Sequence, residues 1–212
     1  CIRDSMSRVE LPMMFNLHHP LNLEVIGAEA QHDNMQSAAY RVIWGFLRKC
    51  PASKVRFCIF DPKEGGGSVR MLSNFVNKMP DSYKRAVTQM SRTEELLSCL
   101  KELEGQTLDF IRDRPDYDDL LDYNAHNPRR TEAITLLMLY DFPLNADARC
   151  LELLSSVMQK GNRCGIYVVL CRNTAVEVAS SYDHIDEKLA ELEKNCVQIE
   201  CKENGFALLP YH

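Results

Sequence analysis

Four apolar segments of this chain end in, or are closely followed by, a residue suited to binding a charged ligand. These residues are Gly27, Asp61, Asp141 and Asn173. A glycine lets the backbone approach a ligand closely, a carboxylate can hold a cation, and an amide can donate a hydrogen bond. If the segments are parallel strands, all four residues lie at the edge of the sheet where open α/β folds bind their ligands. With a helix following Gly27, this order is typical of a site for nucleotide phosphates.

The elements that would position these residues are indicated by hydrophobic period. Strand-like apolar runs alternate with segments of helical period, which predicts βαβ units and an α/β fold with a mainly parallel central sheet flanked by helices. The runs span residues 23–27, 55–60, 86–90, 134–140 and 166–171. In the run 134–140 only Thr135 is polar, which predicts a strand covered on both faces. Near the end, a turn at residues 203–205 predicts a small C-terminal β-hairpin.

Capping residues predict where the helices begin and end. We expect Asp33 to cap a helix that runs to residue 49, Ser91 with Glu94 to form a capping box, and Asn145 to cap a later helix. Gly161 is predicted as the left-handed residue that ends that later helix. A last helix is expected at residues 185–193, and residues 115–130 are predicted to form a surface loop.

Composition indicates an ordinary globular domain. The chain has 212 residues, 45% of them hydrophobic and 26% charged, and a net charge of −5. No run reaches the ~18 apolar residues of a membrane span, so we expect no membrane contact by this chain. The acidic balance argues against avid nucleic-acid binding by the chain alone. Nine cysteines without a CxxC pair fit buried thiols in the cytoplasm. We assign residues 1–20 to an N-terminal extension and 21–212 to one domain.

Residues 23–173 resemble a motor domain of the FtsK/SpoIIIE/HerA group of translocase ATPases. The segment VRFCIFDPKEGGG, with Asp61 and Lys63, is similar to the second strand of that family, which ends in DPK or DFKGG. LLMLYDF, with Asp141, lies where the family has its Walker B strand. NRCGIYVVLCRN resembles the family's GRxxGIHLxLATQ strand, and Asn173 takes the place of its sensor glutamine. The resemblance implies a RecA-like P-loop NTPase fold in three layers, with ATP and Mg²⁺ as the family's ligands.

The phosphate-binding window departs from the family pattern GxxxxGK[ST]. Residues 27–34 read GAEAQHDN, in which only Gly27 fits. His32 replaces the second glycine, Asp33 the lysine and Asn34 the hydroxyl residue. A carboxylate about 4 Å from a phosphate oxygen is unfavourable by about 4 kcal/mol at an effective dielectric constant of 20. That energy is about a thousandfold in affinity, so we expect ATP not to bind as it does in the family.

The Walker B end departs as well. Asp141 is retained, but Phe142 replaces the catalytic glutamate and cannot accept a proton. Without phosphate, the single carboxylate of Asp141 is a poor Mg²⁺ site, and a role in a cap or turn is favoured. We therefore expect no catalytic residue, no metal site and no ATP or Mg²⁺ cofactor.

Other residues of chemical interest have simpler interpretations that we prefer. We expect Gly65 to Gly67 to form a flexible loop and not an anion nest. Cys164 is expected to be a buried thiol and not a nucleophile, and Trp44 a packing residue and not a stacking platform. Solvated side chains are favoured over metal ligands for a last group, which comprises His18, His19, Asp116, Asp118, Asp119 and Asp122.

These expectations combine into a degenerate, non-hydrolysing FtsK/SpoIIIE-like domain that acts as a structural or regulatory module of a larger translocase. Its partners would be other domains of the same polypeptide or ring neighbours, with DNA reached through the full assembly. The alternative is an active ATP-binding DNA translocase subunit with a non-standard phosphate loop, in which Lys63 supplies positive charge. A third possibility is an interaction module whose cleft binds a peptide or a partner's loop.

Overall fold

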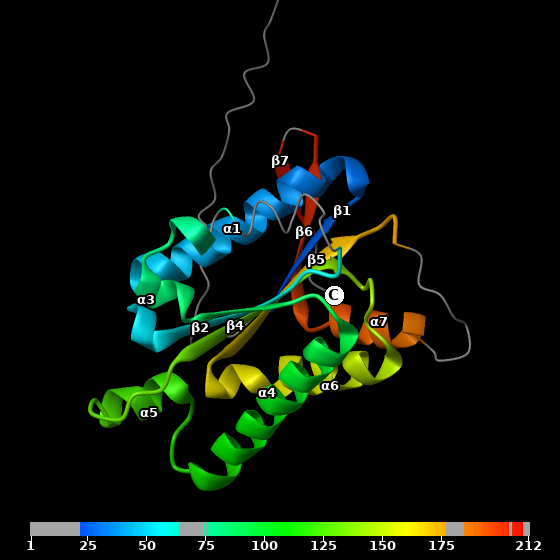
Figure 1. Ribbon diagram of the computed structural model, residues 1–212. Helices are drawn as coiled ribbons and strands as arrows, with labels where there is room; N and C mark the ends of the chain where they lie inside the picture. The colour runs from blue at the N-terminus through cyan, green and yellow to red at the C-terminus, as the bar shows by residue number, and fades with distance from the viewer. Residues whose placement is uncertain (1–21, 64–73, 75, 177–184, 204, 210–212) are drawn as a thin grey trace, which may run out of the picture.

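The computed structural model describes residues 22–63, 74, 76–176, 185–203 and 205–209 (Figure 1). The described strands are β1 (Asn22–Gly27), β2 (Val55–Phe60), β3 (Val87–Met90), β4 (Ile134–Phe142), β5 (Ile166–Asn173), β6 (Cys196–Lys202) and β7 (Gly205–Leu208). The α-helices are α1 (His32–Lys49), α3 (Asp81–Lys84), α4 (Thr93–Asp113), α5 (Leu120–His126), α6 (Ala148–Lys160) and α7 (Ile185–Glu193). Short 3₁₀ turns are η1 (Glu29–Gln31), η2 (Ala52–Lys54) and η3 (Gly161–Cys164).

The strands form one seven-stranded sheet in the order β3-β2-β4-β5-β1-β6-β7. All described neighbours pair in parallel except β6 and β7, which form an antiparallel hairpin. The predicted α/β class and the C-terminal hairpin are therefore confirmed. In this order β5 lies between β1 and β4, so the end of β5 separates Gly27 from Asp141.

Two apolar layers cover the sheet, because successive strand side chains point to opposite faces. Figure 1 shows α1 on one side of the sheet and α4, α6 and α7 on the other. Phe57 and Met138 pack on the α1 side, whereas Cys58, Leu137 and Leu139 pack on the opposite side. All nine residues of β4 are buried, as its apolar sequence predicts.

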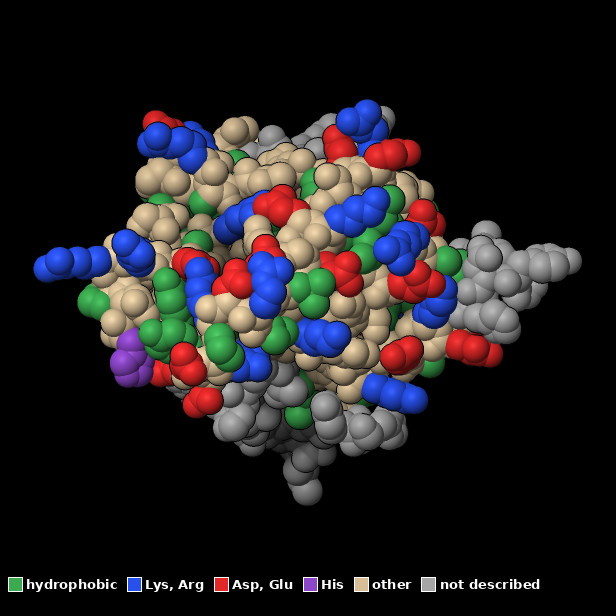
Figure 2. Space-filling model, turned by 90° about the horizontal axis from the view of Figure 1, so that it is seen from below, with side chains coloured by type: hydrophobic (Ala, Val, Ile, Leu, Met, Phe, Trp, Pro, Cys, Tyr) green, Lys and Arg blue, Asp and Glu red, His purple; other side chains and the backbone are tan. Residues whose placement is uncertain are grey.

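The face formed by α4, α6 and α7 is covered by charges of both signs. Figure 2, which looks onto this side, shows Lys and Arg interspersed with Asp and Glu. Several of these charges are paired, including Lys188 with Glu152 at 2.9 Å and Arg112 with Asp109 at 2.7 Å. On the described part of this face, basic and acidic side chains therefore alternate.

The predicted cap of the first helix was wrong by two residues. Helix α1 begins at His32, and Gln31 occupies the N-cap position without a side-chain cap. Asp33 instead lies in the first turn, where a carboxylate is favourable beside the positive end of the helix dipole. The caps of α4 and α6 also lie at other residues than predicted.

At α4 the capping carboxylate is Glu95 and not Glu94. Glu95 Oε2 accepts hydrogen bonds from the backbone N–H groups of Ser91 at 3.0 Å and Arg92 at 3.2 Å. At α6 the cap is Asp147, whose Oδ1 accepts from the Cys150 N–H at 2.7 Å.

Three further predictions about single elements or residues were wrong. Residues 115–130 are not all loop, because α5 lies within them. Gly161 has a right-handed backbone conformation with φ −64°, because η3 continues directly from α6. The glycine with the left-handed conformation is Gly165, which follows η3 and has φ 74°. Trp44 is 53% exposed on α1 and does not contribute a buried side chain to the core.

Candidate functional site

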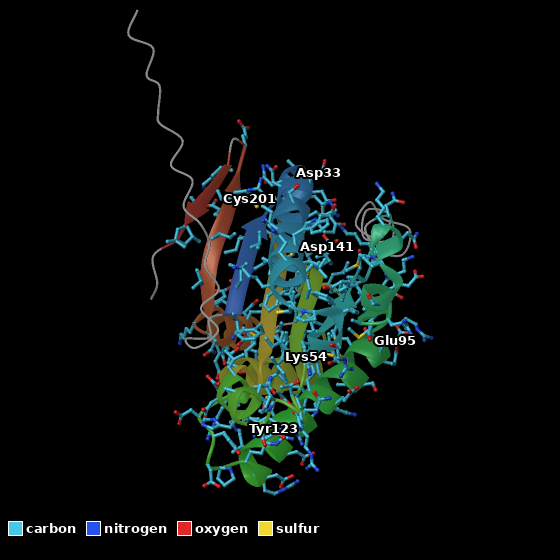
Figure 3. All side chains as sticks on the ribbon, turned by 90° about the vertical axis from the view of Figure 1, so that its left-hand side faces the viewer. Asp33, Lys54, Glu95, Tyr123, Asp141 and Cys201 are labelled. Carbon is cyan, nitrogen blue, oxygen red and sulfur yellow. The ribbon has the colours of Figure 1, made fainter. Side chains whose placement is uncertain are left out.

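The carboxyl ends of β2, β4 and β5 bring charged and polar side chains together with the loop that follows β1. The β1–β5 register pairs Gly27 with Asn173, and the Thr174 N–H donates to the Gly27 carbonyl at 2.9 Å. Asn173 in turn contacts Asp141 at the end of β4. In Figure 3, Asp33 and Asp141 lie toward one end of the sheet and Lys54 and Tyr123 toward the other. We call Glu29, Lys63, Asp141 and Asn173 the carboxyl-edge network.

Asp141 is the buried centre of this network. Its side chain is fully buried and its backbone has φ 48°, a left-handed conformation that turns the chain at the end of β4. Oδ1 lies 3.0 Å from Lys63 Nζ and accepts a hydrogen bond from Asn173 Nδ2 at 3.0 Å. Oδ2 faces His32 Nε2 at 3.7 Å. The turn role expected for Asp141 is present, and the side chain also anchors a cation.

Lys63 reaches Asp141 from beyond the end of β2. Its backbone N–H donates to Asp61 Oδ1 at 3.2 Å, which holds the segment after the strand. Partial burial opposes the charge of Lys63, but hydrogen bonds and charges from Asp141 and Glu29 outweigh it and raise the lysine pKa. Lys63 is therefore a firmly held cation shared by two carboxylates.

Glu29 is the residue of the network that the sequence reasoning missed. It lies in η1, directly after β1, and its Oε2 accepts from Asn173 Nδ2 at 2.7 Å and faces Lys63 Nζ at 3.4 Å. The hydrogen bond from Asn173 and the charge of Lys63 lower the pKa of Glu29. The signal in the sequence was a carboxylate inside the window GAEAQHDN, two residues after Gly27.

The loop between β1 and α1 forms a closed turn through its own hydrogen bonds. The Ala28 N–H donates to Gln31 Oε1 at 3.0 Å, and the Gln31 N–H donates to the Ala28 carbonyl at 2.9 Å. A P-loop binds phosphate through free backbone N–H groups. Gly27 allows a close approach here as well, since a Cβ at this position would lie 3.0 Å from the Met35 thioether sulfur. In this chain the glycine accommodates a core side chain of α1.

Four other predicted positions lie at the margin of the network or outside it. Asp33 is exposed on α1, and no ion pair joins it to another residue within the described part of the chain. Asn34 donates to the Lys202 carbonyl at 3.3 Å and so links α1 to the end of β6. Phe142 is buried in the core beside α4 and α6 and turns away from the edge. His32 lies at the margin, where it faces Asp141.

The remaining candidates add no second site within the described residues. His18, His19 and the glycines 65–67 lie outside the described residues. Cys164 is partly buried, and burial raises its pKa, which agrees with a structural thiol. Among the residues that the structure describes, no group of three or more His, Cys, Asp or Glu side chains could hold a metal ion. In the same ranges, no helix has the length and apolar character needed to span a membrane.

Solved structures of secretion and conjugation ATPases share this architecture. The pCW3 conjugation coupling protein TcpA, in a monomer form with ATPγS, matches with a TM-score of 0.62 and 11% identity over 88% of this chain and 50% of that one. The type VII secretion ATPase EccC of Thermomonospora curvata matches at 0.59 and 16%, over 86% and 20%. ATPases 2 and 3 of EssC from Geobacillus thermodenitrificans match at 0.60 and 12%, over 86% and 32%.

The chain has a RecA-like fold. The predicted fold class is thus confirmed by the sheet and by these neighbours. The chain spans between a fifth and a half of the length of these three structures. Neither the family models nor the curated proteins gave a match to the sequence.

Proposed function

We propose that this chain is a degenerate, non-hydrolysing FtsK/SpoIIIE-like domain that serves as a structural or regulatory module of a larger ATP-driven translocase. In this role it works without bound ATP or Mg²⁺ and has no catalytic residue. Its fold keeps the shape of a motor domain, and its edge residues bind one another.

The observation that carries the proposal is the internal pairing of the carboxyl-edge network. Lys63 is held by Asp141 and Glu29, and Asn173 donates to the same two carboxylates. The Ala28 N–H is bonded to Gln31. Among the described residues, the Lys63 ammonium, the Asn173 amide and the Ala28 N–H could attract a phosphate at this edge, and each is already bonded to a side chain of the chain itself.

A triphosphate would have to displace these bonds and also approach carboxylates. One carboxylate about 4 Å from a phosphate oxygen costs about 4 kcal/mol at an effective dielectric constant of 20. This is about a thousandfold in affinity. Glu29 supplies such a charge within the network, and Asp33, in the place of the family's lysine, adds another nearby.

Titration calorimetry with ATPγS and Mg²⁺ tests the proposal. We expect no measurable heat of binding for the wild-type chain and a gain of binding in the double variant Glu29→Gln/Asp33→Lys, which removes one carboxylate and reverses another. The matched control is Glu94→Gln/Asp116→Lys. It changes net charge by the same amount at two exposed positions away from β1 and α1, and it should stay silent.

Micromolar binding by the wild-type chain, or Mg²⁺-dependent hydrolysis that is lost in Asp141→Asn, would overturn the proposal. Wild-type binding that disappears in Lys63→Met would favour the active translocase with a non-standard loop. If the control variant gains binding equally, net charge and not the edge explains the effect.

The proposed partners are other domains of the same polypeptide or ring neighbours in the cytoplasm, with DNA contacted only through the full assembly. This part of the proposal is supported by the short span of the chain relative to its structural neighbours, which are larger ATPases. Co-purification of this chain with separately expressed neighbouring domains tests it. The contact lies at residues 27–34 if replacing these residues abolishes co-purification while circular dichroism shows that the fold is intact.

A further inference from the structure

The outward face of α1 carries an exposed tryptophan between two arginines. Trp44 is 53% exposed. Arg41, three positions before it, and Arg48, four positions after it, are exposed as well. Residues three and four apart are neighbours on one face of a helix, so the three side chains form one row. We call Arg41, Trp44 and Arg48 the α1 stripe.

The two arginines of the α1 stripe are available to a partner. Within the described residues, neither guanidinium forms an ion pair or a hydrogen bond with another side chain. By contrast, Arg56 and Arg112 are paired with carboxylates at 2.8 Å and 2.7 Å. Tryptophan and arginine are the residue types most enriched among the side chains that dominate binding at protein interfaces. The α1 stripe therefore has the composition of a docking surface.

A pocket beside α5 has the complementary chemistry. Its volume is about 460 Å³, and it is lined by two apolar side chains and three carboxylates, namely Leu121, Ala125, Asp118, Asp119 and Asp122. Asp116, which is exposed, lies two positions before this group. Within the described residues, no cation pairs with the carboxylate of Asp116 or of Asp118. An indole on the apolar lining would bring flanking guanidinium groups to these carboxylates.

The stripe and the pocket lie on the same side of the sheet, so one chain carries both halves of the contact. Phe46 on α1 and Leu120 on α5 belong to the same apolar cluster. Figures 1 and 3 both show α5 below α1 on this side of the molecule. Trp44 does not fill the pocket of its own chain, because its side chain is more than half exposed. A twofold axis between two copies would bring each stripe to the other pocket.

We propose that the α1 stripe docks on the α5 pocket of a second copy of this chain, in a twofold dimer that contains the contact twice. The indole packs on the apolar lining, and the two arginines pair with Asp116 and Asp118 of the other copy. Charge complementarity selects this occupant, since each unpaired cation meets an unpaired carboxylate. The surface is separate from the carboxyl-edge network, so the proposal does not depend on whether the chain binds a nucleotide.

Sedimentation velocity of the whole chain over a dilution series tests the proposal. We expect a reversible equilibrium between monomer and dimer that weakens as salt is added, because exposed ion pairs are screened. Trp44 is the only tryptophan in the sequence, so its emission should shift to shorter wavelength as the dimer forms. Trp44→Ala should weaken the association by about 30-fold or more, which is the effect of removing one dominant interface side chain.

Charge exchange identifies the two surfaces that meet. Arg41→Glu/Arg48→Glu and Asp116→Lys/Asp118→Lys should each be monomeric, because each places like charges on both sides of the contact. An equimolar mixture of the two variants should form a one-to-one dimer, since both contacts then join opposite charges. The matched control Lys101→Glu/Lys160→Glu changes the net charge as the arginine variant does, at exposed positions on α4 and α6, and should still dimerise.

The proposal is overturned if the wild-type chain stays monomeric up to about 1 mM, if the mixture stays monomeric, or if either charge-reversed variant still dimerises. An assembly of more than two copies would overturn the twofold arrangement. Quenching of Trp44 emission by a single-stranded oligonucleotide, without self-association of the chain, would assign the α1 stripe to nucleic acid instead. Circular dichroism checks the fold of each variant, and the wild-type dilution series decides the question even if a variant fails to fold.

Discussion

Replacing Lys63 by methionine removes the cation from the carboxyl-edge network and keeps most of the side chain's length. Asp141, which is fully buried, then lacks the cation that lies 3.0 Å from its Oδ1. A buried charge without a partner is strongly unfavourable, so the folded state should be destabilised.

The size of the effect follows from the geometry. A pair 3.0 Å apart corresponds to about 5.5 kcal/mol at an effective dielectric constant of 20. The loss is smaller than this because Lys63 is 33% exposed to solvent and because Asn173 still donates to Asp141. We expect the free energy of unfolding to fall by about 2–3 kcal/mol, below the ~3–5 kcal/mol typical of breaking a fully buried pair. For a chain of this size that is a decrease in Tm of about 5–10 °C.

Urea unfolding of Lys63→Met, Asp141→Asn and the double variant measures this. Asparagine tolerates the left-handed backbone at position 141 and leaves Lys63 beside Glu29 and solvent, so Asp141→Asn should cost less than about 1 kcal/mol. The double variant should be more stable than Lys63→Met alone, because it contains no uncompensated buried charge. A Lys63→Met effect below about 0.5 kcal/mol, or strict additivity in the double variant, would refute the reasoning.

Two further predictions concern single residues in other parts of the fold. Gly165→Ala places a Cβ 2.3 Å from Leu120 Cδ2 at a backbone φ of +74°. Urea unfolding of this variant should show that the free energy of unfolding falls by about 2 kcal/mol or more. Gly105 on α4 has open space around it, so Gly105→Ala should raise the free energy of unfolding by about 0.5–1 kcal/mol. Equal effects at the two glycines would contradict the role of strain. Hydrogen bonds from two backbone N–H groups and from the Arg92 side chain lower the pKa of Glu95 from 4.5 to about 2. The contribution of Glu95 to the stability of the folded state is therefore complete above about pH 4.5 and is lost as the pH falls toward 2. This component of the pH dependence of unfolding should vanish in Glu95→Gln and persist in Glu94→Gln.

Much of the sheet could be predicted from the sequence because buried strands need apolar residues whatever surrounds them. The run containing Thr135 as its one polar residue became the fully buried strand β4. Helix starts were less predictable, since neighbouring residues such as Glu94 and Glu95 have the same capping chemistry and only the backbone path selects one. The prediction for Trp44 was wrong because only one face of α1 packs on the sheet. The sequence does not fix which large side chain of the helix lies on the exposed face.

The sequence by itself determined which chemical groups are present and that the strand ends would carry them. It placed Gly27, Asp61, Asp141 and Asn173 after apolar runs, and it placed the acidic Asp33 six residues after Gly27. Only the tertiary structure decided which of these groups bind one another. Glu29 and Lys63 lie 34 positions apart, yet their side chains meet over Asp141 because the sheet order sets β5 between β1 and β4. Electrostatic attraction depends on distance in space, which a linear pattern does not contain.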